Sequence, residues 1–133
     1  MATQTIPRGA NGKSEFVVLP SAARALAQDY TSDDFVVPYG KTLTLVIDIT
    51  AGAATPSVTP KFRGVTPTGI VYTVLTGAAI TSTSAAQVIM RVGHGIAEVA
   101  NLGTAIPLPA QFRLVMTHAD TDSLTYSVSA EVS

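Results

Sequence analysis

Lys41-Thr42-Leu43-Thr44-Leu45-Val46-Ile47-Asp48-Ile49-Thr50 is the stretch of sequence that decides the fold. Its large aliphatic residues fall on one parity, at positions 43, 45, 47 and 49. Its threonines and its aspartate fall on the other parity, where Val46 is the one exception. Because successive side chains of a strand point to opposite faces, this alternation predicts a long strand with one buried face and one wetter face.

Two further strand-like runs follow this stretch, at residues 58–64 and 70–75. Thr66-Pro67-Thr68-Gly69 lies between them and is typical of a tight turn. We therefore expect three successive antiparallel strands, the last two joined by that turn.

The rest of the chain adds short strands punctuated by glycine and proline. We expect strands at residues 15–19, 35–37, 87–92, 112–118 and 124–130, with the last two forming a hairpin. Residues 21–28 suit either a short helix or an extended segment along a sheet edge, and residues 96–102 suit a short helical turn. The pattern predicts an all-β protein, an antiparallel β-sandwich of the jelly-roll or immunoglobulin-like kind. We expect its core to include Leu43, Leu45, Ile47, Ile49, Phe112, Leu114, Tyr126 and Val128.

The N-terminal residues differ in composition from the rest of the chain. Residues 1–14 are polar and rich in turn formers, so we expect them to form an extended arm, with residues 15–133 as one sandwich domain. The arm carries one apolar anchor, one rigid φ angle and one cation at Ile6, Pro7 and Arg8. We expect these three residues, with Phe16 and Val18 on the next strand, to contact a neighbouring subunit, and we expect the arm to become ordered only on that neighbour. A flexible tail without a partner is the alternative.

Composition excludes several classes of function. The formal net charge is -1 and only 13% of residues are charged, which argues against nucleic-acid binding. The low charge also favours association over a free monomer. The chain has no cysteine, so thiol chemistry and cysteine-based zinc sites are excluded. No apolar run approaches the ~20 residues that cross a bilayer, so we expect no membrane partner.

No set of reactive residues converges in the sequence. His94 lies between two glycines and is interpreted as a solvated turn residue. His118, Asp120 and Asp122 could present ligands to a cation, but carboxylates in a turn more often accept hydrogen bonds from their own backbone. Asp48 is interpreted as a strand carboxylate on the wetter face. We expect no catalytic residue, no cofactor and no metal, and hence no enzyme.

The chain resembles small structural proteins encoded in the virion gene clusters of tailed bacteriophages and prophages, from about residue 21 to the C-terminus. The resemblance rests on these segments: Leu45-Val46-Ile47-Asp48-Ile49-Thr50-Ala51, Val58-Thr59-Pro60-Lys61-Phe62-Arg63-Gly64, Gly69-Ile70-Val71-Tyr72-Thr73-Val74-Leu75, Ala79-Ile80-Thr81, Arg91-Val92-Gly93-His94-Gly95, Leu108-Pro109-Ala110-Gln111-Phe112-Arg113-Leu114, Val115-Met116-Thr117-His118-Ala119-Asp120 and Leu124-Thr125-Tyr126-Ser127-Val128. Val65-Thr66-Pro67-Thr68 departs from the strongly polar turn expected between the third and fourth strands.

The resemblance implies a capsid decoration or cement protein on the outer surface of a phage head. Its partners would be the major capsid protein and other copies of itself, with a trimer favoured. A head–tail or tail component is one alternative. A carbohydrate-binding module for the host surface is another, although four Tyr, four Phe and no Trp offer few rings to stack on sugar.

Overall fold

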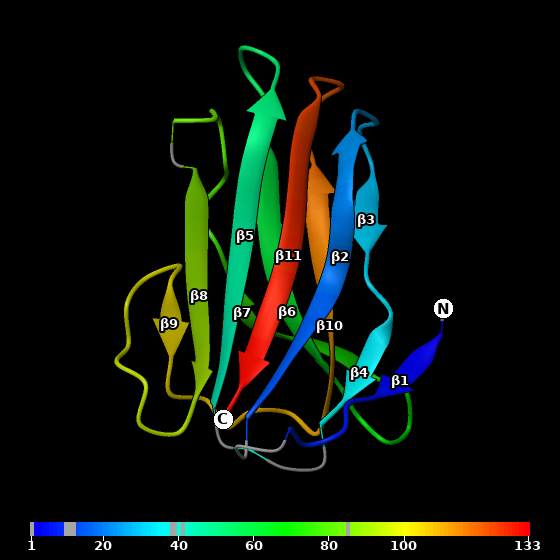
Figure 1. Cartoon of the computed structure of the whole chain (residues 1–133), viewed down its shortest axis with the longest axis vertical. Coiled ribbons are helices and arrows are strands. Elements are labelled where there is room, and N and C mark those ends of the chain that lie inside the picture. The colour runs from blue at the N-terminus through cyan, green and yellow to red at the C-terminus, as the bar shows by residue number, and fades with distance from the viewer. Residues whose placement is uncertain (1, 10–12, 38–39, 41, 85) are drawn as a thin grey trace.

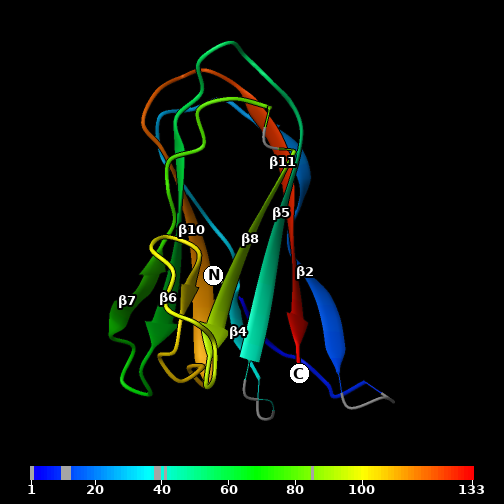
Figure 2. The ribbon, with the colours of Figure 1, turned by 90° about the vertical axis from the view of Figure 1, so that its left-hand side faces the viewer.

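The computed structural model describes residues 2–9, 13–37, 40, 42–84 and 86–133. Within these residues the chain forms strands and connecting loops and contains no helix. The strands make two sheets that pack face to face, as the side view in Figure 2 shows. The prediction of a β-sandwich is thus confirmed. In the described part of the chain there is accordingly no helix long and apolar enough to cross a membrane.

The two sheets, named here sheet I and sheet II, share the strands almost equally (Figure 1). Sheet I has the order β1 (Thr3–Thr5), β4 (Asp34–Val36), β10 (Gln111–His118), β6 (Val58–Val65) and β7 (Val71–Thr76), and β3 (Asp29–Thr31) also pairs with β10. Sheet II has the order β2 (Ser14–Arg24), β11 (Leu124–Val132), β5 (Thr42–Gly52), β8 (Gln87–Gly93) and β9 (Gly103–Thr104).

The order of the eight main strands is that of a jelly roll. Sheet II reads β2-β11-β5-β8 and sheet I reads β4-β10-β6-β7, so successive main strands lie in opposite sheets except β6 and β7, which pair within sheet I. This order selects the jelly roll over the immunoglobulin-like alternative, because an immunoglobulin sandwich places its strands differently.

Two expected strand pairings are wrong. β10 and β11 do not form a hairpin, because β10 lies in sheet I and β11 lies in sheet II between β2 and β5. Likewise β5 and β6 lie in opposite sheets, whereas the β6–β7 hairpin is confirmed with its turn closed by a bond from Gly69 N to Thr66 O of 2.9 Å. The crossing loops at residues 53–57 and 119–123 contact each other, since Ala119 N donates to Ser57 O at 3.0 Å and Ala53 N donates to Ser123 O at 2.7 Å. A short polar loop has the same sequence character whether it turns within a sheet or crosses between sheets.

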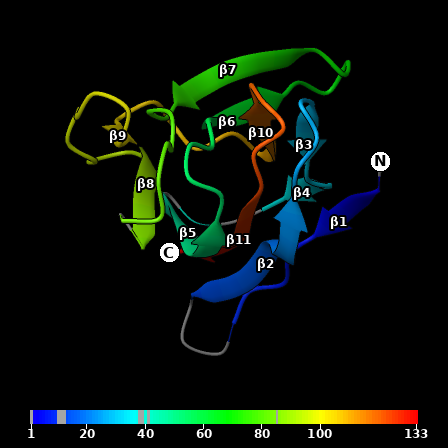
Figure 3. The same cartoon turned by 90° about the horizontal axis from the view of Figure 1, so that it is seen from above.

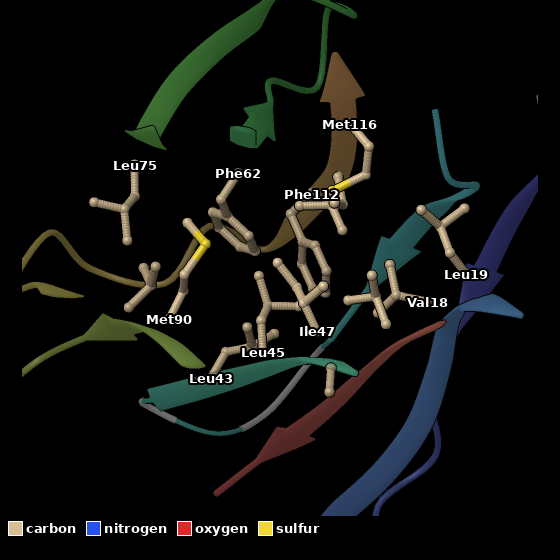
Figure 4. Packing of buried hydrophobic residues seen from close by; sticks show 14 of the residues in the cluster. Val18, Leu19, Leu43, Leu45, Ile47, Phe62, Leu75, Met90, Phe112 and Met116 are labelled. Atoms are coloured by element: carbon tan, nitrogen blue, oxygen red, sulfur yellow. The ribbon is translucent and has the colours of Figure 1, made fainter. Parts of the chain in front are cut away.

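The core lies between the sheets, on the parity that the sequence predicts. Figure 4 shows Phe62, Phe112 and Met116 of sheet I facing Leu43, Leu45 and Ile47 of sheet II. All eight residues expected in the core are buried, at 5% exposure or less: Leu43, Leu45, Ile47, Ile49, Phe112, Leu114, Tyr126 and Val128. The alternation along β5 therefore sets the packing of the whole sandwich.

β2 is longer than expected and replaces the helix option. It runs through Pro20 to Arg24, so the extended alternative for residues 21–28 holds as far as Arg24, and the expected end of this strand at residue 19 is wrong. β2 is an edge strand paired only with β11, and its register shifts on either side of Val128. Edge strands and bulges tolerate proline because its missing N–H is not needed there. No helix forms at residues 96–102: residues 96–98 are irregular, Val99 forms an isolated bridge with Gly103, and residues 100–102 form a turn with Asn101 at φ 65°.

The N-terminal segment packs on its own sandwich. β1 pairs in parallel with β4, Ile6 N donates to Val36 O at 2.9 Å, and the Ile6 side chain is 7% exposed. We expected residues 1–14 to order only on a neighbour. Instead, the described part of residues 1–14 is ordered on the chain itself, by one apolar side chain and by pairing along the edge of β4. Residues 1 and 10–12 lie outside the described residues.

Candidate interaction surfaces

The five residues predicted to bind a partner divide between core and surface. Ile6 and Val18 are buried in the core, and Phe16 packs against it with its ring 5.1 Å from that of Phe35. Pro7 and Arg8 are exposed. Ser14 closes this segment, because its hydroxyl donates to Pro7 O and accepts from Gly9 N at 3.0 Å. Only Pro7 and Arg8 therefore present their side chains at the surface.

The histidine and aspartate candidates do not share one site. His94 is exposed between glycines of positive φ. The His118 ring points into the sandwich, where its Nε2 lies 2.9 Å from the Tyr126 hydroxyl. Asp120 accepts from the backbone N of Asp122 at 3.1 Å, as the turn interpretation predicted. No group of three metal-ligand side chains gathers anywhere in the described ranges.

His118 and Tyr126 belong to a buried polar cluster with Arg24 and Tyr30. The cluster joins the sheets, because His118 and Tyr30 come from sheet I whereas Tyr126 and Arg24 come from sheet II. The Arg24 guanidinium lies 4.4 Å from the centre of the Tyr126 ring and donates to Tyr126 O at 2.8 Å. The Tyr30 ring meets the His118 ring edge-on at 4.8 Å.

This environment disfavours a charged imidazole and a charged phenolate. Burial, and then the charge of Arg24, lower the pKa of His118, while Asp120 acts in the opposite direction. Burial raises the pKa of the Tyr126 hydroxyl. Both side chains are therefore neutral near pH 7, and the cluster contains no nucleophile or base exposed to a substrate. Its geometry suits a structural role.

The outer face of sheet I carries a basic strip, defined as Lys61 and Arg63 on β6 and Arg113 on β10. Asp34 neutralises Arg113 through two hydrogen bonds of 2.6 and 2.9 Å. Arg63 lies directly across from Arg113, and its buried Nε has no hydrogen-bond partner in the described part of the chain. Sequence analysis did not single out this strip, because the three cations come from strands about 50 residues apart.

The outer face of sheet II carries an apolar row. The row consists of Val17, Val46 and Ile89, which lie in cross-strand register with Ser129 between Val17 and Val46. Val17 is 59% exposed and Ile89 is 39% exposed. Carboxylates flank the row, because Glu15 and Glu131 are paired in register. Val46, the exception to the alternation of β5, thus marks this surface. An apolar residue on the otherwise polar face of β5 is the sequence feature that could have indicated this apolar row.

Figure 3 shows the β8–β9 edge of sheet II beside one end of β7. Two hollows lie at this edge. One has a volume of about 300 Å³ and is lined by Ile89, Arg91, Gly95, Ile96, Ala97, Val99, Leu102 and Gly103. The other has a volume of about 250 Å³ and is lined by Ala78, Ala79, Ile80, Thr81, Ser82, Val88 and Leu102. They meet at Leu102, which is 46% exposed.

Comparison with known proteins supports the fold but assigns neither a family nor a function. No protein-family model matches the chain, and no curated protein matches it significantly in sequence. Among solved structures, the chain is similar to the crystal structure of the SPBc2 prophage-derived protein YomS, with a TM-score of 0.54 and 15% identity over 90% of this chain and 91% of that one. It is also similar to part of the structure of infectious bursal disease virus, Gx strain, with a TM-score of 0.45 and 13% identity over 90% of this chain and 31% of that one. At these identities the likeness to YomS shows a shared sandwich fold.

Proposed function

We propose that the protein is a structural virion protein of a tailed phage or prophage, and more specifically a decoration or cement protein on the outer surface of the head. The single observation that carries this proposal is the agreement of two independent likenesses. The sequence resembles virion-cluster proteins, and the fold matches a prophage-derived protein over about nine tenths of both chains.

The architecture supports this role. The described chain buries most of its large side chains between two sheets and leaves a surface with few charges, on which some large apolar residues such as Val17 and Leu102 are exposed. A rigid sandwich of this kind suits repeated docking on a lattice, where many weak contacts add up through avidity. His118 is buried against Tyr126, Asp120 accepts a hydrogen bond from its own turn, and exposed His94 lies between two glycines, so we propose no catalytic role.

The proposed partners are the major capsid protein and other copies of this chain, with a trimer favoured. Arg113 of the basic strip is paired with Asp34, and Glu131 of sheet II is paired with Lys13. The remaining charges, Lys61 and Arg63 on sheet I and Glu15 on sheet II, are opposite in sign, which suits contact between neighbouring copies or with a charged capsid surface. Pro7 and Arg8 are the exposed residues through which the N-terminal segment would reach such a neighbour.

Localisation on particles tests the proposal. Immunogold labelling of purified particles from the same genome should place the protein on the head in many symmetric copies, and a cryo-electron microscopy map should show the sandwich at a symmetry axis. Label confined to the neck or tail would select the head–tail alternative. Absence from particles, together with specific binding on a glycan array, would contradict the proposal and favour the carbohydrate-binding module.

A further inference from the structure

The edge of sheet II at β8 offers main-chain groups to an added strand. β5 pairs with β8 on one side from Gly93 to Gln87. On the other side β9 reaches only Arg91 and Val92. Figure 1 shows β9 beside the lower part of β8, and no described strand continues it upwards. The first half of β8 is therefore a free sheet edge.

The hydrogen-bonding sense of this edge follows from its neighbours. Ile49 N donates to Ala86 O at 2.8 Å. Every second residue after Ala86, beginning with Val88, therefore forms its backbone hydrogen bonds with β5. The backbone N–H and C=O groups of the residues between them point away from β5, as the hydrogen bond of 2.9 Å from Arg91 N to Leu102 O shows. The N–H and C=O of Ile89 thus point out from the edge, and no strand in the described ranges receives them.

An apolar hollow lies on each face of this edge. The larger one adjoins Ile89, whose side chain is on the outer face of sheet II, and is walled by Ile96 and Val99. The smaller one adjoins Val88, which alternates to the inner face, and is walled by Ile80. Consecutive residues of an added strand point to opposite faces, so one would enter each hollow on either side of Leu102.

The positively charged side chain of Arg91 lies at one end of the larger hollow. Arg91 is exposed and lines that hollow, and its guanidinium forms no ion pair or hydrogen bond with any described residue. A carboxylate on the added segment, at the end nearest Arg91, would match this charge.

We propose that the free edge of β8 is a strand-addition site for an extended segment of a partner protein that carries two consecutive large apolar residues and a carboxylate. A second copy does not supply this segment, because no two of the exposed large apolar residues in the described chain are adjacent in sequence: Val17, Leu26, Ile70, Tyr72, Ile89, Val99, Leu102 and Ile106. The proposal does not depend on where the protein acts.

Selection from a display library of random heptapeptides, with the full chain as bait, tests the proposal. Enriched peptides should share two adjacent large apolar residues and an Asp or Glu, and should lack proline between them. Synthetic copies should bind the protein in a titration calorimeter. Ile89→Pro, which removes the outward N–H from an edge position, and Leu102→Asp should each weaken binding by about tenfold or more. Val17→Asp, an exposed apolar position on the opposite edge strand, is the matched control and should bind as the unaltered chain does.

A charge cycle checks the orientation of the segment. Replacing the peptide carboxylate by its amide should weaken binding to the unaltered protein but not to Arg91→Gln. Absence of such peptides from the selection would overturn the proposal, as would unchanged binding by a Leu102→Asp variant that melts like the unaltered chain. A dimer in sedimentation that Leu102→Asp abolishes would replace the partner segment with a second copy. None of these outcomes bears on whether the protein is found on particles.

Discussion

At the end of the sandwich near Phe112, four phenylalanine rings close the space between the sheets, whereas at the end near Tyr126 the same space is closed by polar side chains. The Phe112 ring lies 4.9 Å from the Phe62 ring and 5.7 Å from the Phe35 ring, and Phe16 of the opposite sheet lies 6.3 Å away. At the other end, His118 of sheet I and Tyr126 of sheet II link the sheets by a hydrogen bond. Arg24 of sheet II lies over the Tyr126 ring and reaches the Tyr30 ring of sheet I, with its guanidinium 5.9 Å from the centre of that ring.

The two ends differ in what their contacts require. Apolar rings pack in many arrangements as long as volume is conserved, so the phenylalanine end depends on total burial. The polar end depends on particular atoms, because each buried donor or acceptor without a partner is costly. His118 already has its Nδ1 buried without a partner in the described chain, so its bond to Tyr126 is the one that remains.

Removal of the central ring should produce the largest effect. Phe112 is fully buried, and Phe112→Ala should lower the free energy of unfolding by about 3–5 kcal/mol through lost burial and the cavity left behind. Urea denaturation measures this change, with Val17→Ala on the exposed face as the control, where we expect less than about 0.5 kcal/mol. A loss below about 1 kcal/mol would show that this end is loosely packed, contrary to the ring distances.

The N-terminal segment should contribute to the same core. Ile6→Ala should lower the free energy of unfolding of the isolated chain by about 2–3 kcal/mol, because Ile6 is buried beside β4. Denaturant unfolding of the isolated protein measures it, with exposed Thr3→Ala on β1 as the control. A midpoint unchanged by Ile6→Ala would restore the view of residues 1–14 as an arm that orders only on a partner.

The polar end should respond to the loss of a single oxygen. Tyr126→Phe keeps the ring but leaves Nε2 of His118 buried without its hydroxyl, so it should cost about 1–3 kcal/mol. Thermal or urea unfolding at pH 7.5 measures it. The double variant Tyr126→Phe with His118→Leu should recover part of the loss, since an apolar pair leaves nothing unsatisfied. If the loss of stability in the double variant equals the sum of the losses in the two single variants, the two side chains are not coupled.

The contrast between the ends also explains how far the sequence could predict the structure. Period-two alternation predicted the β-sandwich and the inward parity of Phe112 and Tyr126, because burial repeats every second residue. The turn formers at residues 66–69 predicted the β6–β7 turn. It did not predict that β10 and β11 separate into different sheets, since five loop residues serve a hairpin or a crossover equally well. Nor could it bring Arg24 onto Tyr126, because that contact spans 102 positions and depends on the crossover.

The candidate surfaces were harder still to predict. Ile6 and Val18 were expected to face a partner, and both are buried in the core. For Ile6 the reason is that a short segment with one large apolar residue has the same composition in either role. The hollows around Leu102 arise from a loop folding back on a sheet edge. Such a concavity has no periodicity in the sequence.

The smallest effect should be a loss of stability on mild acidification. Burial and Arg24 hold the pKa of His118 below its ordinary value of 6.5, so between those two values the unfolded chain binds a proton that the folded chain does not. Stability is therefore full above about pH 6.5 and declines as the pH falls towards the folded pKa, with a slope that one proton limits to about 1.4 kcal/mol per pH unit. The groups around the imidazole are Arg24, Tyr126, Tyr30 and, in the opposite sense, Asp120.

Urea unfolding at pH 7.5, 6.5 and 5.5 measures this decline. His118→Leu should flatten the profile over that interval, whereas His94→Leu should leave its slope unchanged, because His94 is exposed between two glycines. A profile that is already flat in the unaltered protein, or one that only His94→Leu flattens, would mean that His118 accepts its proton without resistance. The polar end would then be as tolerant as the phenylalanine end, and the contrast between them would fail at the histidine.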